Sequence, residues 1–445
     1  MEAPRLRCIL FAPAEYAPAS SPPIFGLHVV ERTVLAFLRA GVREFLVVGD
    51  PEGARWIAGA LASRRFREAR VRMLNPESSL LPVLEREEPC FVARADHLYD
   101  RRLVARFVAE TRDASATVVA ADFRADALQS QEGAARIASW GTSGVEGGAE
   151  GMRVAGQGLL APAGVFAGLA RVGASFARAF EDAPPALRSP ENALSLLARR
   201  EPVATWAVAE LWQAVRGEPD ARSADLVLAR RKVMGGAVGV DDGVVARYLN
   251  RPISRRISER LLSRDVKPWQ LSLMSFLTTV GAGTAFAVGH PAMGGMIAQF
   301  AAVLDGVDGE IARIRYQDSP FGGVYDALLD RIGDAALIGG MTLYAWVVGA
   351  GHSAVALGFG AVAGSSLSML VKEKYGTQFR QPWLSDREGR WRWLLLGRDG
   401  RLFLSLVAGL TGYVEAVLAY LAVGTHLHAG VRIYRIRSEA ARGSG

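Results

Sequence analysis

The chain has 445 residues, half of them apolar, with a formal net charge of +7 and two cysteines, which support neither a disulfide framework nor a zinc site. The excess charge is mostly arginine, and the apolar runs gather after about residue 268. This distribution favours basic loops beside a membrane and gives no sign of nucleic-acid binding. The apolar run before Pro13 is too short for a signal peptide.

The N-terminal half alternates between predicted strands and predicted helices. Such an alternation predicts an α/β, Rossmann-like domain on a doubly wound parallel sheet, which we place at residues 1–232 in the cytosol. Residues 139–151, rich in Gly, Ser and Glu, are expected to form a loop. Strands are expected at 7–14, 43–50, 68–74, 89–95 and 116–122, and helices at 27–42, 51–64 and 101–111.

Residues 233–268 are predicted to form an amphipathic helix lying on a membrane surface. Basic residues alternate there with apolar ones, a pattern that suits a helix at the level of lipid headgroups. A helix exposed only to solvent is the alternative. The basic residues are Arg247, Arg251, Arg255, Arg256, Arg260, Arg264 and Lys267.

Six apolar segments follow, and they predict an all-α domain of six transmembrane helices at residues 269–437 with a tail at 438–445. The basic helix precedes the first span, and an even number of spans returns the basic tail to the same side. We therefore expect a multi-pass protein of the cell membrane whose N-terminal domain and active site face the cytoplasm. The segments are 269–289, 291–313, 321–349, 353–373, 400–412 and 414–433.

Four aspartates interrupt the second and third apolar segments: Asp305, Asp308, Asp326 and Asp330. A carboxylate at bilayer depth is costly unless it is paired or binds a metal. Spacings of three and four place each pair on one helix face, and a turn near 314–321 lets two antiparallel helices bring the carboxylates together. Oxygen ligands favour Mg²⁺, Mn²⁺ or Ca²⁺ over zinc, so the sequence predicts a divalent-metal site.

These aspartates belong to the pattern D-x2-D-G-x2-A-R-x8-G-x3-D-x3-D, which the chain matches at every fixed position over residues 305–330. By this pattern the C-terminal part resembles the CDP-alcohol phosphotransferases, also called CDP-alcohol phosphatidyltransferases. The resemblance implies transfer of a phosphoalcohol from a CDP-alcohol to an acceptor hydroxyl, with release of CMP. The order of domains is similar to that of fused inositol-1-phosphate cytidylyltransferase and di-myo-inositol-phosphate phosphate synthase proteins.

The resemblance also implies roles for the motif residues and a homodimeric state. Two Mg²⁺ or Mn²⁺ ions are expected on the four aspartates, and Asp330 is expected to be the general base toward the acceptor hydroxyl. One departure is visible, because the family usually has Pro-Asn before the first span and here Trp269 follows Pro268. The residues expected to contact the CDP group are Asp308, Gly309, Ala312, Arg313 and Gly322.

The substrates are left open by the sequence. The donor is either a soluble CDP-polyol such as CDP-inositol, with an inositol phosphate as acceptor, or CDP-diacylglycerol. An acceptor that carries a phosphate needs cations near the site, although the basic bias of cytoplasmic loops explains the same residues. Asp334 is interpreted as a support for the site or as a polar helix end, and His426 and His428 as structural. The acceptor-phosphate candidates are Lys372, Lys374, Arg398 and Arg401.

Residues 31–50 and 93–100 resemble sugar-phosphate nucleotidyltransferases. Those enzymes hold a triphosphate with a glycine-rich loop and a lysine. Here the loop at residues 11–26 has one glycine, Gly26, and no basic residue. Asp96 stands where a metal ligand could lie, but no aspartate directly follows Trp212 to supply a second one. We expect this domain to keep the fold and to lack catalysis; an active cytidylyltransferase is the alternative.

Overall fold

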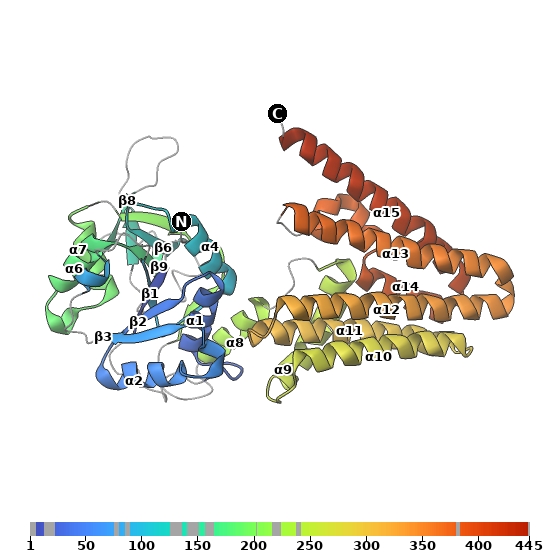
Figure 1. Cartoon of the computed structure of the whole chain (residues 1–445), viewed down its shortest axis with the longest axis horizontal. Helices are drawn as coiled ribbons and strands as arrows, with labels where there is room; N and C mark the ends of the chain where they lie inside the picture. The colour runs from blue at the N-terminus through green and yellow to red at the C-terminus, as the bar shows by residue number, and fades with distance from the viewer. Residues whose placement is uncertain are drawn as a thin grey trace. The chain divides into compact units, whose positions relative to one another are not determined.

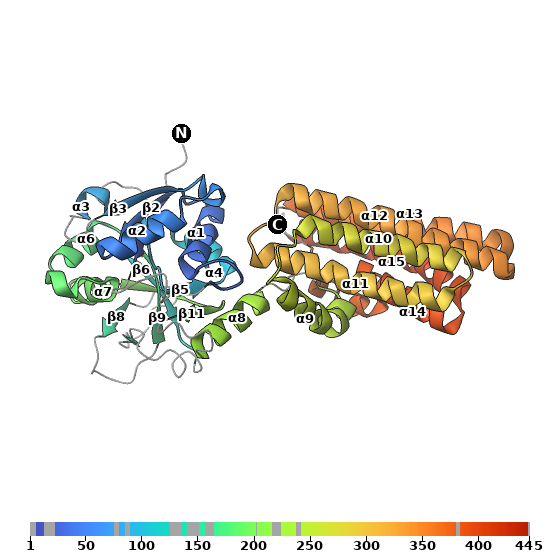
Figure 2. The ribbon, with the colours of Figure 1, turned by 90° about the horizontal axis from the view of Figure 1, so that it is seen from below.

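The chain divides into two compact units, Met1–Gly236 and Ala237–Gly445, which Figures 1 and 2 show from two directions. Residues 140–150 of the loop predicted at 139–151, and residues 13–22 of the loop at 11–26, lie outside the part that the structure describes. This computed structural model describes residues 6–12, 23–74, 80–84, 90–124, 136–139, 151–155, 164–201, 203–215, 224–236, 242–379 and 383–443.

The first unit is built on a mixed β-sheet with the strand order β3-β2-β1-β4-β9-β6-β10-β8-β7. Its half around β1 is parallel, as the alternation of elements predicts. The prediction of a purely parallel sheet is wrong, because β9 runs antiparallel between β4 and β6. The strands are β1 (Arg7–Phe11), β2 (Glu44–Val48), β3 (Arg70–Leu74), β4 (Cys90–Arg94), β6 (Val118–Asp122), β7 (Arg136–Ser139), β8 (Gly151–Ala155), β9 (Gly164–Val172) and β10 (Val203–Ala207).

Helices cover both faces of this sheet. On one face Phe91 of β4 packs against Phe37 of α1 and Phe107 of α4, with ring centroids 6.2 and 6.1 Å apart. On the other face Phe11 of β1 packs against Phe180 of α6 at 5.4 Å. Side chains of one strand alternate between the two faces of the sheet. Because helices cover both faces, the side chains on both are buried. The helices are α1 (Val29–Arg39), α2 (Pro51–Ala60), α3 (Leu81–Leu84), α4 (Arg101–Thr111), α6 (Ala174–Glu181), α7 (Pro190–Ala198) and α8 (Ala224–Gly236); β5 (His97–Tyr99) pairs with β11 (Trp212–Ala214) in a second sheet.

The second unit is helical, and its long helices lie side by side in Figures 1 and 2. Helix α10 packs against α11 and α12, α11 also packs against α14, and α13 packs against α15. The positions agree with the predicted segments to within a few residues, apart from α13 and α15, which extend further. The helices are α9 (Arg251–Leu261), α10 (Pro268–Ala287), α11 (Pro291–Ile314), α12 (Pro320–Ala345), α13 (Gly351–Phe379), α14 (Arg398–Thr411) and α15 (Val414–Gly443).

The amphipathic helix predicted at 233–268 is shorter in the structure. Helix α8 ends at Gly236, a π-helical turn spans Ala246–Asn250, and α9 then begins with Pro252 in its first turn. Proline is tolerated there because the first N–H groups of a helix have no partner within it. The glycines at 235, 236, 239 and 243 disfavour a continuous helix before that point.

Two helical stretches in the described part of the chain are long and apolar enough to cross a membrane: Pro320–Phe379 and Val414–Glu439. The first covers α12 and α13 and is kinked at Gly349, whose φ is 119°. Helix α14 has 14 residues, which is short for a full crossing. Six transmembrane helices therefore stay a prediction, and the helical C-terminal unit is the observation.

Candidate active site

Three carboxylates from two helices meet at one point in the second unit. Ligand oxygens of Asp305 and Asp308 on α11 and of Asp326 on α12 lie within 4.8 Å of one another. Asp308 is buried and accepts a hydrogen bond from Ser272 on α10 at 2.5 Å. Carboxylates this close repel unless a cation or a shared proton compensates them. Their oxygens fit a hard divalent cation such as Mg²⁺.

The turn between α11 and α12 sets this geometry. Tyr316 adopts a left-handed backbone with φ of 54°, and the Gln317 N–H bonds the Ala312 carbonyl at 2.8 Å, which closes the end of α11. Ser319 then caps α12 by accepting the Gly322 N–H at 3.0 Å. A cap at this position fixes where α12 begins, and with it the places of the aspartates that follow.

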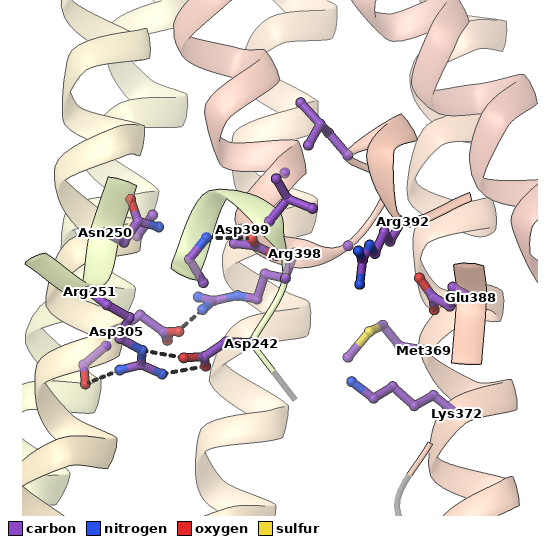
Figure 3. Close-up of a pocket in the computed structure, with 18 of the residues that line it drawn as sticks. Asp242, Asn250, Arg251, Asp305, Met369, Lys372, Glu388, Arg392, Arg398 and Asp399 are labelled. Carbon is purple, nitrogen blue, oxygen red and sulfur yellow. Dashed lines mark hydrogen bonds and ion pairs between the residues drawn. The ribbon is translucent and has the colours of Figure 1, made fainter. Parts of the chain in front are cut away.

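The fourth aspartate joins the cluster through an arginine. Arg398, in the first turn of α14, donates to Asp305 at 2.5 Å and to Asp330 at 2.8 Å, and its side chain is 11% exposed. Figure 3 shows Arg398 and Asp305 pointing toward one another. Arg398 was predicted to bind the acceptor, and the structure places it between two of the four carboxylates.

Arg401 lies in a different environment from Arg398. It is buried, pairs with Asp334 one turn beyond Asp330, and donates to the Leu396 carbonyl at 3.0 Å. Asp334 is therefore the partner of a buried arginine. Lys374 is exposed on α13.

A pocket of about 200 Å³ opens beside Asp305 (Figure 3). Residues 242–251, α11, α13, the 3-10 segment η6 (Ser385–Leu394) and the start of α14 supply most of its lining, and α15 adds Arg432. Of the four acceptor candidates, Lys372 and Arg398 line it. The charged lining residues are Arg251, Lys372, Arg392, Arg398, Arg432, Asp242, Asp305, Glu388 and Asp399.

Arg392 and Arg432 were missed by sequence reasoning. Arg432 lies near the end of the last apolar segment, where it looked like one more cytoplasmic basic residue. Arg392 lies in a short segment without any motif. Only the folding of α13, η6 and α15 together places both beside Lys372 in one lining.

The residues expected to contact CDP lie near the carboxylate cluster. Gly309 lies beneath Arg313, since a Cβ on Gly309 would stand 3.0 Å from the Arg313 guanidinium. Ala312 is half-buried on the same helix, and Gly322 is exposed at the start of α12. The absence of a side chain at Gly309 thus makes room for the Arg313 guanidinium against the helix backbone.

A buried network fixes α9 to helix α11, which carries Asp305 and Asp308. Glu310, next to the cluster on α11, accepts hydrogen bonds from Arg251, Ser254 and Ser258 at 2.9, 2.7 and 2.6 Å. Arg251 also donates to the Gly306 carbonyl at 3.0 Å. The basic helix thus contacts the same stretch of α11 that carries the first two aspartates.

Comparison with known proteins agrees with this geometry. Residues 266–426 match the model of the CDP-alcohol phosphatidyltransferase family. These residues form a CDP-alcohol phosphatidyltransferase domain. The match indicates a transferase, and the whole carboxylate cluster lies inside the matched range.

Relatives match beyond this transferase domain. A "Bifunctional IPC transferase and DIPP synthase" of Rubrobacter xylanophilus is 38% identical over 45% of this chain and 43% of its own length. One of the same name from Aquifex aeolicus is 30% identical over 58% of each chain. The chain therefore spans about half the length of these curated relatives. The match to the solved inositol-1-phosphate CTP transferase from T. maritima covers 52% of this chain and 96% of that one, with 13% identity and a TM-score of 0.40.

Outside the transferase domain, Asp96 of the first unit is engaged by neighbouring basic groups. Arg94 donates to both of its oxygens at 2.8 and 2.9 Å, and Nδ1 of His97 lies 2.8 Å from Oδ1. Burial alone would raise the pKa of Asp96, but His97 and Arg94 outweigh it and hold that pKa well below the usual value. Arg94 thus engages both oxygens of the carboxylate that the sequence singles out as a possible metal ligand.

Proposed function

We propose that the protein is an integral-membrane, metal-dependent CDP-alcohol phosphotransferase that uses CDP-inositol as donor and an inositol phosphate as acceptor. The observation that carries the proposal is the meeting of Asp305, Asp308 and Asp326 within 4.8 Å, beside a pocket lined by both basic and acidic side chains. The names of the relatives, which point to inositol phosphate chemistry, support the choice of substrates.

The aspartate cluster suits two divalent cations, Mg²⁺ or Mn²⁺. Asp305, Asp308 and Asp326 would hold them together with Asp330. When bound, such ions neutralise the diphosphate of the donor and stabilise the charge that develops on the leaving CMP. Ser272 orients Asp308, and Arg398 keeps Asp305 and Asp330 close together.

The chain's own residues then supply the proton transfer and the binding contacts. Asp330 accepts the proton of the acceptor hydroxyl, whose oxygen attacks the phosphorus that carries the donor alcohol. The bond between that phosphorus and the bridging oxygen of the diphosphate breaks, and CMP leaves with the electron pair. Arg313 contacts the diphosphate, while Gly309 and Gly322 leave room for the CDP group.

The pocket beside Asp305 is proposed to bind the acceptor. Lys372, Arg392 and Arg432 come from three different elements and supply positive charge for a phosphate. Acidic residues of the same lining, among them Asp242, can accept hydrogen bonds from polyol hydroxyls. A lining of mixed charge suits a polyol phosphate better than a fully anionic or a purely apolar acceptor.

The location of the protein follows from the same proposal. The transferase domain spans the cell membrane with six helices, and the first unit, α9 and the active site face the cytoplasm. The apolar stretches of α12–α13 and of α15 support membrane insertion. A homodimer and contact with bilayer lipids are further parts of this proposal. The first unit is proposed to be catalytically inactive, with an active cytidylyltransferase as the alternative that the relatives' names favour.

A CDP-diacylglycerol-dependent phospholipid synthase is the second candidate. It is favoured by a carboxylate cluster on apolar helices, where a lipid-linked donor can arrive from the bilayer. The two candidates share the aspartates and differ in the donor alone.

One experiment separates them. The full chain, purified in detergent with Mg²⁺, is given CDP-inositol or CDP-diacylglycerol, with and without inositol 1-phosphate, and the release of CMP is measured. We expect release with CDP-inositol that depends on inositol 1-phosphate. Release with CDP-diacylglycerol alone as donor would establish the second candidate, and no release with any pairing or wider acceptor panel would reject both.

A further inference from the structure

One acidic side chain of the pocket has no part in the proposed reaction. Glu388 lies in η6 beside Gly389, whose φ of 58° bends the segment, and its side chain lines the pocket (Figure 3). Arg432 of α15 is part of the same lining. Its Oε1 atom accepts a hydrogen bond from Nε of Arg432 at 2.9 Å and a second from Nη2. One carboxylate oxygen therefore occupies a whole edge of the guanidinium.

That edge of Arg432 is well suited to binding a phosphate. Nε and one Nη of a guanidinium donate in parallel and match the oxygens of a carboxylate or a phosphate. The remaining nitrogen of Arg432, Nη1, donates to the carbonyl and to the hydroxyl of Ser368 on α13 at 2.6 and 2.8 Å. Because Ser368 holds Arg432 from the other side, the guanidinium does not need Glu388 to stay in place.

The surroundings of Glu388 hold it in this position. Nε2 of His428, a buried residue of α15, lies 3.2 Å from the second carboxylate oxygen of Glu388. Lys372 lies one turn beyond Ser368 on α13 and lines the same pocket. A phosphate that enters the pocket toward Lys372 therefore meets an arginine edge that an internal anion already fills.

We propose that Glu388 determines the affinity for the acceptor, because its carboxylate and the acceptor phosphate compete for Arg432. This inference rests on the proposed function, since it names a further residue of the same acceptor pocket. Two anions cannot both use one guanidinium edge, so binding of the phosphate requires the contact between Glu388 and Arg432 to break. The competition weakens the binding of phosphorylated acceptors and leaves the donor side unaffected.

The test uses Glu388→Gln in the full chain, because this change removes the charge and keeps the shape. We expect KM for inositol 1-phosphate to fall about ten-fold, in line with the loss of one charge-assisted hydrogen bond from the competing group. KM for CDP-inositol should not change. Titration calorimetry with inorganic phosphate should show a similar gain in affinity without any turnover.

Two further variants keep the result specific. Glu373→Gln removes a charge next to Lys372, but Glu373 is exposed, pairs with Arg331 at 2.7 Å and does not line the pocket, so it should leave both constants unchanged. In an Arg432→Gln background, Glu388→Gln should no longer increase the affinity for phosphate. Measuring both single variants and the double variant gives the double-mutant cycle that tests this coupling.

The outcomes separate this inference from the proposed function. Phosphate binding that is equal or weaker in Glu388→Gln, or a gain that persists without Arg432, overturns the competition. A wild-type chain that releases no CMP rejects the proposed function, while the phosphate titration still decides the role of Glu388.

Discussion

Asp330 is set apart from the other motif aspartates by its partner. Among the described residues the metal-compatible group holds Asp305, Asp308 and Asp326, whereas Asp330 pairs with Arg398 at 2.8 Å. A carboxylate held by an arginine at the edge of the cluster is fixed in its orientation, which suits a group that must accept a proton from a bound hydroxyl.

Replacing Asp330 by asparagine tests this role. We expect turnover to fall by about 10²–10⁴-fold, because an amide cannot accept the proton. Equilibrium binding of CDP-inositol, measured by calorimetry, should stay close to that of the wild type, since Asp305, Asp308 and Asp326 remain. Full CMP release in Asp330→Asn would remove Asp330 as the base, and loss of donor binding would make it a metal ligand only.

Arg401 is expected to act on stability rather than on the acceptor. Arg401→Gln removes the closest charged partner of the buried Asp334 and leaves it only Arg398, whose Nε lies 4.0 Å away. Breaking a buried ion pair from one side costs about 3–5 kcal/mol. Thermal unfolding of the purified chain should show a clear loss of stability. Lys374→Gln, a change at an exposed residue, is the control and should stay within about 0.5 kcal/mol. Unchanged stability together with a raised acceptor KM would give Arg401 an acceptor role instead.

The sequence allowed the aspartates to be predicted for a physical reason. Carboxylates in apolar helices need a compensating partner, and their spacing already places them on two helix faces. The partners themselves could not be predicted. Ser272, Arg398 and Arg432 reach the site from other helices, and only tertiary packing decides which of several basic residues faces it.

At the scale of elements, the position of α12 is set by its close approach to α10. Gly340 of α12 lies against Gly283 of α10, and a Cβ on Gly340 would collide with the Gly283 carbonyl. Small residues allow two backbones to approach, which is the usual way helices pack when their surroundings are apolar. The crossing fixes α12, and with it Asp326 and Asp330, against the helix that carries Ser272.

Two neighbouring glycines of α12 provide a matched pair of mutations. Gly340→Ala should destabilise the unit by about 1–3 kcal/mol, because the added methyl group forces the two helices apart. Gly339→Ala meets no atom within 4 Å and should be neutral or slightly stabilising, since alanine favours a helix over glycine. Thermal unfolding measures both variants, and CMP release should decrease in Gly340→Ala. Equal stabilities in the two variants would contradict a tight crossing.

Elements with strong periodicity were predicted well, whereas elements set by long-range pairing were not. Apolar runs located the helices α10 to α15, and the alternation of strands and helices located β1, β2 and β4. The antiparallel strand β9 was missed, because its partners β4 and β6 lie far away in sequence and no local pattern reveals their pairing.

At the scale of the whole molecule, the chain joins two units with separate cores and unequal chemistry. The transferase domain gathers carboxylates whose charge calls for cations. In the first unit Asp96 is already compensated by Arg94 and His97. The carboxylates of the transferase domain can therefore bind cations, whereas Asp96 is already paired with basic side chains. We predict that only the transferase domain turns over substrate.

The activity of the first unit can be measured directly. With CTP, inositol 1-phosphate and Mg²⁺, we expect the full chain to release no pyrophosphate above the rate without enzyme. Arg94 occupies the carboxylate that would bind the metal, and the loop at residues 11–26 has no basic residue to hold a triphosphate.

The same preparation must release CMP from CDP-inositol and inositol 1-phosphate, which shows that the chain is folded. Pyrophosphate release that disappears in Asp96→Asn would make the protein bifunctional and overturn this prediction. Without such release, the CDP-alcohol has to come from a separate cytidylyltransferase reaction. The first unit would then have a structural or binding role. Among the described residues, the four aspartates of the transferase domain would form the catalytic centre.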